Sequence, residues 1–85
     1  MYKAKQWDRV RSLHVPGLPE RGWVEGVVFG FEMRSDGVVY VKIAGLDSRD
    51  QEGQEDVYYA PQNGTPTWFG EVCDGISLIA EGAKV

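Results

Sequence analysis

Only a few side chains in this sequence could carry out covalent or metal chemistry. His14 is the single histidine and Cys73 the single cysteine, and the chain has no Cys-x-x-Cys pair. A nucleophilic thiol needs a base beside it, and a zinc site needs several Cys or His ligands. We therefore predict a histidine on a surface loop, a partly buried structural thiol, no metal and no cofactor.

The carboxylates are concentrated in residues 47–56, which read DSRDQEGQED. A calcium-binding EF-hand loop needs acids at positions 1, 3 and 5, glycine at 6 and glutamate at 12. With the one glycine at position 6, a serine falls at position 1 and a tyrosine at position 12. Glu55 and Asp56 are adjacent, and neighbours in an extended strand point to opposite faces, so they cannot act together on one bond. We predict a solvated acidic loop here and no catalytic centre.

Charge is unevenly distributed along the chain. The formal net charge of −4 opposes general binding to nucleic acid, because phosphate neutralisation supplies most of that affinity. Residues 1–21 nevertheless carry a net charge of +3, and the acidic loop, residues 47–56, a net charge of −4. Nucleic acid is therefore not the expected partner, and weak binding through a basic N-terminal arm stays an alternative. The residues that would carry it are Lys3, Lys5, Arg9 and Arg11.

The length of 85 residues is that of one small domain, which buries only about 60–65% of its unfolded surface. The hydrophobic fraction of 42% is too high for a disordered chain, and no apolar run reaches the ~20 residues of a membrane helix. A lone cysteine cannot form an intrachain disulfide, which indicates a reducing, cytoplasmic setting. We expect one domain over residues 1–85, with an arm at 1–7 and a frayed end at 81–85. Such a small chain often gains stability by self-association, and it fits a product of a phage or another mobile element.

Strand-forming residues predict an all-β domain. Trp23–Met33 and Val38–Gly45 are rich in β-branched and aromatic residues, which favour strands. Shorter strands are predicted at residues 8–13, 56–60 and 76–80, with a strand or an irregular turn at 68–72. Loops rich in glycine and proline separate these segments. About five short strands indicate a small barrel or roll.

The register of the longest hairpin follows from keeping one of its faces apolar. A two-residue turn would set Phe31 opposite Lys42, whereas a three-residue loop with Gly37 in the left-handed conformation sets Phe31 opposite Val41. We therefore predict the three-residue loop. It gives the pairs Phe31 with Val41, Phe29 with Ile43, Met33 with Val39, Glu32 with Tyr40 and Gly30 with Lys42.

In this register Gly26 and Gly30 lie on the face of the first strand opposite Phe29 and Phe31. Glycine weakens a strand unless the strand must bend or another backbone packs closely against it. We expect the strand to coil sharply around a small barrel, with Phe29 and Phe31 in the core together with Trp23.

The segments Asp8-Arg9-Val10-Arg11 and Gly26-Val27-Val28-Phe29-Gly30-Phe31, with Trp23 between them, resemble the opening of SH3-like small barrels. Over residues 8–60 the pattern is similar to the plasmid-borne type II dihydrofolate reductases, and it also resembles KOW-type barrels and a small barrel protein of photosystem I. The resemblance implies the SH3-like fold. It also implies, as an alternative function, a small oligomeric ligand-binding protein or reductase with a site shared between subunits.

The chain departs from the reductase family at the positions that would carry its activity. Ser12 and Leu13 stand where that family has lysines. Its substrate-binding Val-Gln-Ile-Tyr segment corresponds to residues 57–60, where only Val57 is retained. We therefore expect a protein without enzymatic activity.

The ten aromatic residues exceed what a small core requires. Tyr58 and Tyr59 alternate in a predicted strand, so at least one faces outward. SH3-like barrels bind proline-rich or basic peptides with exposed Tyr and Trp beside an acidic loop, although the same rings could fill the core or a homo-oligomer interface. We expect a self-associating protein-interaction module that binds a protein partner, or a second copy, through an aromatic face bordered by the acidic loop. Its binding residues are Tyr58, Tyr59, Trp68, Asp50, Glu52 and Glu55.

Overall fold

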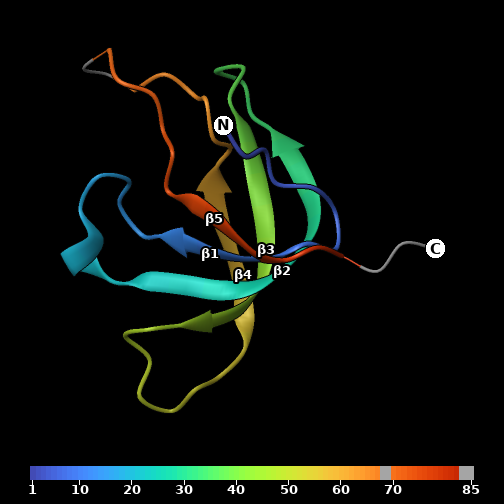
Figure 1. Cartoon of the computed structure of the whole chain (residues 1–85), viewed down its shortest axis with the longest axis vertical. Coiled ribbons are helices and arrows are strands. Elements are labelled where there is room, and N and C mark those ends of the chain that lie inside the picture. Colours follow the sequence, from blue (N-terminus) through green and yellow to red (C-terminus); the bar gives the residue numbers. More distant parts are fainter. Residues whose placement is uncertain (68–69, 83–85) are drawn as a thin grey trace.

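The structure is a computed structural model that describes residues 1–67 and 70–82. Five strands form one antiparallel sheet in the order β4-β3-β2-β1-β5 (Figure 1). The elements are β1 (Arg9–Leu13), the 3-10 turn η1 (Pro19–Arg21), β2 (Trp23–Met33), β3 (Val39–Asp47), β4 (Asp56–Pro61) and β5 (Ile76–Ala80). In the described chain no helix is long and apolar enough to cross a membrane. The predicted all-β class and the five clearest strand segments are confirmed.

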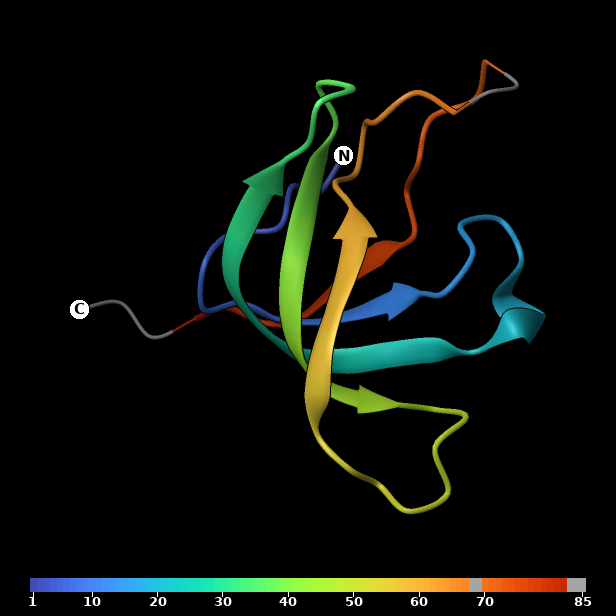
Figure 2. The same cartoon turned by 180° about the vertical axis from the view of Figure 1, so that it is seen from behind.

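The strands form an open, coiled sheet and are not closed into a barrel. β4 and β5 are its two edges, and no ladder joins them within the described residues. β2 and β3 both change direction along their length, so the two halves of the sheet cross each other (Figure 2). This curvature gives the sheet an inner face that holds the core and an outer face that is open to solvent.

A pair of glycines lies where β2 and β3 bend. Gly26 is the cross-strand partner of Gly45, and a Cβ on either would collide with the backbone of the opposite strand. Gly26 thus permits the close backbone approach that a glycine within a strand suggested, although the sheet that it belongs to is not closed into the expected barrel. Gly30 differs, because the nearest atom to its added Cβ would be Lys42 Cδ at 3.8 Å.

The hairpin between β2 and β3 has the predicted three-residue loop, with Gly37 at φ +82°. Four of the five predicted pairs are confirmed, and the fifth is wrong because Ile43 pairs with Val28. A β-bulge between Val28 and Gly30 inserts one extra residue in β2 and reverses the alternation of faces before it. Gly26 and Gly30 therefore lie on opposite faces of the sheet, contrary to the expectation.

The core is aliphatic. The expectation that Phe29, Phe31 and Trp23 form it is wrong: Phe31 is 44% exposed, and the other two rings are only half-buried. The bulge turns Phe29 toward the outer face, where its ring centroid lies 5.1 Å from Lys42 Nζ. The buried core residues are Ala4, Val10, Val24, Val28, Val41, Ile43, Ala60 and Ile76.

Both terminal segments that the structure describes pack onto the domain. In the arm Ala4 is buried and Tyr2 packs against the core. The Gln62 side chain accepts from the Ala4 N–H and donates to its carbonyl, each at 3.1 Å. At the other end the Gly82 N–H donates to the Asp8 carboxylate at 2.9 Å.

Candidate functional site

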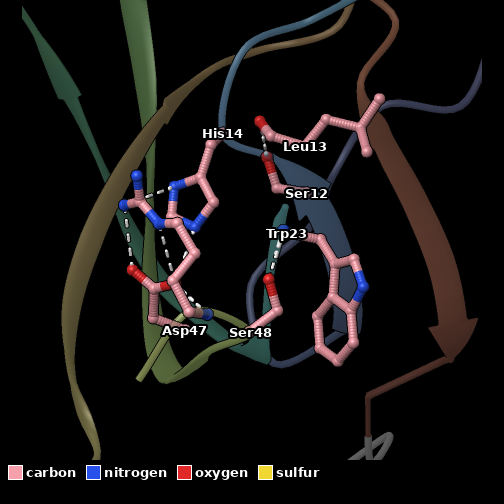
Figure 3. Close-up of polar contacts among 7 residues, drawn as sticks. Ser12, Leu13, His14, Trp23, Asp47 and Ser48 are labelled. Carbon is pink, nitrogen blue, oxygen red and sulfur yellow. Dashed lines mark hydrogen bonds and ion pairs between the residues drawn. The ribbon is translucent and has the colours of Figure 1, made fainter. Parts of the chain in front are cut away.

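The loop after β1 and the end of β3 meet in a polar cluster of His14, Asp47 and Arg49, which we call the His14 cluster; His14 and Asp47 are labelled in Figure 3. His14 Nε2 lies 2.9 Å from Asp47 Oδ1, and Arg49 Nη2 lies 3.3 Å from His14 Nδ1. Arg49 also donates to Asp47 through Nη2 at 3.1 Å, Nε at 3.2 Å and its backbone N–H at 2.8 Å. The three side chains thus form a closed ring of hydrogen bonds.

The hydrogen-bond partners of His14 determine which of its two ring nitrogens carries the proton. A guanidinium can only donate, so His14 Nδ1 accepts from Arg49, and Nε2 carries the proton that it donates to Asp47. The Arg49 side chain is the main reason that the pKa of Asp47 lies well below its ordinary value. The Arg49 backbone N–H and His14 add to this shift, while burial opposes it. Sequence reasoning placed His14 on a loop without a partner and missed this cluster.

Two serines flank the cluster, and both hydroxyls are bonded to backbone. Ser12 is 4% exposed, and its Oγ donates to the Leu13 carbonyl at 3.4 Å. Ser48 Oγ accepts from the Trp23 N–H at 2.8 Å (Figure 3). Serine catalysis needs a hydroxyl bonded to the histidine, whereas both His14 ring nitrogens are engaged elsewhere. The cluster clamps two loops and is not arranged as a nucleophilic centre.

Beside the cluster a pocket of about 80 Å³ lies between the end of β1 and β4, and we call it the β1–β4 pocket. Val24 and Ile43, which are 4% and 0% exposed, give it an apolar floor. Its wall on the β4 side contains Tyr58. The full lining is Ser12, Leu13, His14, Val24, Ile43, Tyr58, Tyr59, Ala60 and Pro61.

Tyr58 and Tyr59 point to opposite faces of the sheet, as their alternation predicted. Tyr58 is the partner of Ile43 and packs against the core. Burial raises its pKa, and the nearby Asp47, together with other acids of the loop, adds to the shift. Tyr59 is 45% exposed, and Arg34 Cζ lies 5.5 Å from its ring centroid.

No protein-family model, curated protein or solved structure matches the chain. The function is therefore inferred from the geometry of the chain alone.

The acidic loop connects β3 and β4 beside Tyr58. Glu52 and Glu55 are exposed. Asp50 shapes the loop, because its carboxylate accepts the N–H groups of Glu52 at 2.9 Å and Gln54 at 3.2 Å. None of these three carboxylates lines the β1–β4 pocket, but Asp50 is near enough to Tyr58 in its wall to help raise the pKa of that tyrosine.

Trp68, the remaining residue of the expected binding face, lies outside the described residues. The segment that contains it leaves the opposite end of β4 from the acidic loop (Figure 2). Its described parts pair as a short hairpin, with a bridge between Pro66 and Val72 and a hydrogen bond from the Thr67 N–H to the Glu71 carbonyl at 2.6 Å.

The four basic residues of the alternative nucleic-acid site are not gathered in one place. Lys3 Nζ donates to the Asn63 carbonyl, and Lys5 is exposed on the arm. Arg9 and Arg11 are exposed on β1, where they alternate with the buried Val10. The two lysines thus lie on the N-terminal arm, whereas Arg9 and Arg11 lie apart from them on the outer face of the sheet.

Cys73 is buried, and burial together with Asp74 raises its pKa, which makes its thiol a poor nucleophile. Across residues 1–67 and 70–82 no group of three or more His, Cys, Asp or Glu side chains could hold a metal ion.

Proposed function

We propose that this chain is a non-catalytic protein-interaction module that binds an extended, basic segment of a partner protein along β4. The observation that carries the proposal is the β1–β4 pocket, a small hole with an apolar floor beside an edge strand and an acidic loop. The coiled five-stranded sheet also supports the resemblance to SH3-like domains, which bind basic or proline-rich peptides.

The outward edge of β4 offers a short stretch of backbone for pairing. The Gln62 N–H donates to the Val39 carbonyl at 3.0 Å. Every second residue before Gln62 along β4 therefore points its backbone N–H and carbonyl groups toward β3. Val57, Tyr59 and Pro61 therefore turn their backbone groups away from β3. Asp56 Oδ1 caps the Val57 N–H at 2.7 Å, and proline has no N–H. A partner strand can thus pair around Tyr59, while both ends of the edge are protected from extended aggregation.

The pocket and the loop supply selectivity. The pocket has room for one short aliphatic or proline side chain, and a desolvated apolar anchor of this kind is typical of interface hot spots. The net charge of −4 on residues 47–56 attracts a basic segment and favours its encounter with the pocket. The partner is therefore expected to present lysines or arginines on either side of a small apolar residue.

The proposal can be tested with fluorescently labelled decapeptides that carry a central proline, valine or leucine flanked by lysines and arginines. We expect saturable binding that weakens with salt. Tyr58→Ala should weaken it by about tenfold or more, whereas Tyr58→Phe, which keeps the ring, should retain it. Glu52→Gln and Glu55→Gln should weaken binding and flatten its salt dependence, and Glu20→Gln in the η1 turn serves as the matched charge control. If no basic peptide binds, or if Tyr58→Ala binds as well as the parent, the proposal is wrong.

A further inference from the structure

The outer face of the sheet carries cations that lie over aromatic rings. Three such pairs lie on β1, β2, β3 and the β2–β3 hairpin, and a fourth, Arg34 with Tyr59, reaches β4. Arg11 Cζ lies 4.1 Å from the Trp23 ring centroid, Lys42 Nζ lies 5.1 Å from that of Phe29, and Arg34 Cζ lies 4.0 Å from that of Tyr40.

The strand register places these residues on one face. Arg11 pairs with Glu25, two residues after Trp23. Lys42 and Tyr40 alternate with the fully buried Val41. These residues therefore all lie on the outer face of the coiled sheet, some on each of its two halves. We call it the outer cationic face, and Arg9 at the start of β1 also belongs to it.

This face is positive although the whole chain is negative. It has two acids among its cations: Glu25 lies 3.7 Å from Arg11 and Glu32 lies 3.3 Å from Arg34. Within residues 1–67 and 70–82, Arg9 and Lys42 have no carboxylate at ion-pair distance. The chain's acidic excess lies instead in residues 47–56, so the total charge of −4 conceals a surface that attracts anions.

We propose that the outer cationic face binds single-stranded nucleic acid. Unpaired bases can stack on the rings and on the guanidinium planes, while the cations neutralise the backbone phosphates. A duplex keeps its bases stacked inside the helix, so it cannot use the rings. This site adjoins the peptide site at Tyr59. It replaces the N-terminal arm as the proposed nucleic-acid surface, because Lys3 of the arm is already bound to the Asn63 carbonyl.

The test is fluorescence anisotropy of the full chain with labelled oligo-dT and oligo-U of about fifteen nucleotides, at low and rising salt. We expect single strands to bind and a duplex of equal length to bind more weakly. Lys42→Ala and Arg9→Ala should each reduce the slope of log affinity against log salt by about 0.7. Lys5→Ala removes the same charge from the arm and should leave the slope unchanged. Tyr40→Ala should weaken binding at least about fivefold, and Tyr40→Phe should retain it.

A gain of affinity separates this proposal from simple loss of folding. Glu25→Gln and Glu32→Gln remove the two acids that compete with phosphate for Arg11 and Arg34. Each should strengthen binding about two- to fivefold, and a destabilised protein would not show such an increase. Three results would overturn the proposal: no binding of single strands at low salt, equal binding of the duplex, or a loss with Lys5→Ala as large as with Lys42→Ala. None of these variants alters the β1–β4 pocket, so the two proposals can fail separately.

Discussion

Two carboxylates, Asp8 and Asp47, are held in their charged form by bonds within the domain. The Asp8 carboxylate accepts the Tyr2 hydroxyl at 2.5 Å and backbone N–H groups, and it is 5% exposed. The bond from Tyr2 is the largest cause that lowers the pKa of Asp8, and burial opposes it. The pKa of Asp47 is lowered chiefly by Arg49. Each carboxylate therefore binds a proton less readily in the folded chain than in the unfolded chain.

This difference predicts a loss of stability in acid. A carboxyl whose folded pKa is depressed contributes stability that is complete above its unfolded pKa of about 3.9. That contribution is lost as the pH falls toward the folded pKa. We expect the free energy of unfolding, measured with urea, to decrease below about pH 5. Tyr2→Phe should lower it at neutral pH by about 1.5–3 kcal/mol and make the acid loss smaller. An unchanged pH dependence in Tyr2→Phe would contradict the assigned role of Tyr2.

At the scale of elements, the bend shared by β2 and β3 depends on backbone contact between two glycines. A Cβ on Gly26 would meet the Ala44 carbonyl oxygen, and a Cβ on Gly45 would meet that of Glu25. Backbone atoms cannot move aside as the end of a flexible side chain can. The close approach therefore requires glycine on both strands.

This contact makes Gly26→Ala a test of the bend. We expect it to destabilise the domain by about 3 kcal/mol or more, because the strands must separate where the sheet turns. Gly30→Ala is the matched control on the same strand. Its added Cβ has ordinary space, so the change should stay within about 1 kcal/mol. Thermal unfolding followed by circular dichroism measures both, and equal stability of the two variants would show that the bend tolerates a side chain.

The elements of this fold could be predicted because their signals are local. Gly37 and the apolar alternation around it were enough to predict the hairpin loop and most of its register. The β-bulge could not be predicted, because it arises from the curvature that the packed sheet requires and leaves no local sequence signal beyond the Gly30 position. That single extra residue turned Phe29 and Trp23 outward, whereas Phe31 keeps its predicted partner Val41 and is nevertheless exposed.

The position of a candidate site residue could be predicted only where the alternation of side chains along one strand determines which face it lies on. Tyr58 and Tyr59 belong to this class. His14 and Asp47 are 33 residues apart, and neither has a spacing that suggests the other. The outer cationic face likewise combines residues of three strands and a hairpin, so it becomes visible only once the register is known.

At the scale of the whole molecule, one amide connects the two edges that the sheet leaves open. Asn63, just after β4, is 2% exposed. Its Oδ1 accepts the Ile76 N–H at 3.1 Å, and its Nδ2 donates to the Ile76 carbonyl at 2.8 Å. The same Nδ2 lies 2.9 Å from the Tyr2 carbonyl. The side chain thus bonds to β5 as a neighbouring strand would, and it holds the N-terminal arm as well.

This arrangement predicts distinct effects for two neighbouring amides. Asn63→Ala leaves backbone groups of Ile76 and Tyr2 without their buried partner, so it should lower the free energy of unfolding by about 2–4 kcal/mol. Native-state hydrogen exchange should accelerate at Ile76 and along the arm, since both lose their attachment to β4. Gln62→Ala removes the bonds to Ala4 and to the Asn63 N–H but none to β5, so exchange should accelerate at Ala4 while Ile76 stays protected. If β5 remained equally protected in Asn63→Ala, packing of Ile76 alone would hold that edge, and the amide would not be what connects β4 to β5.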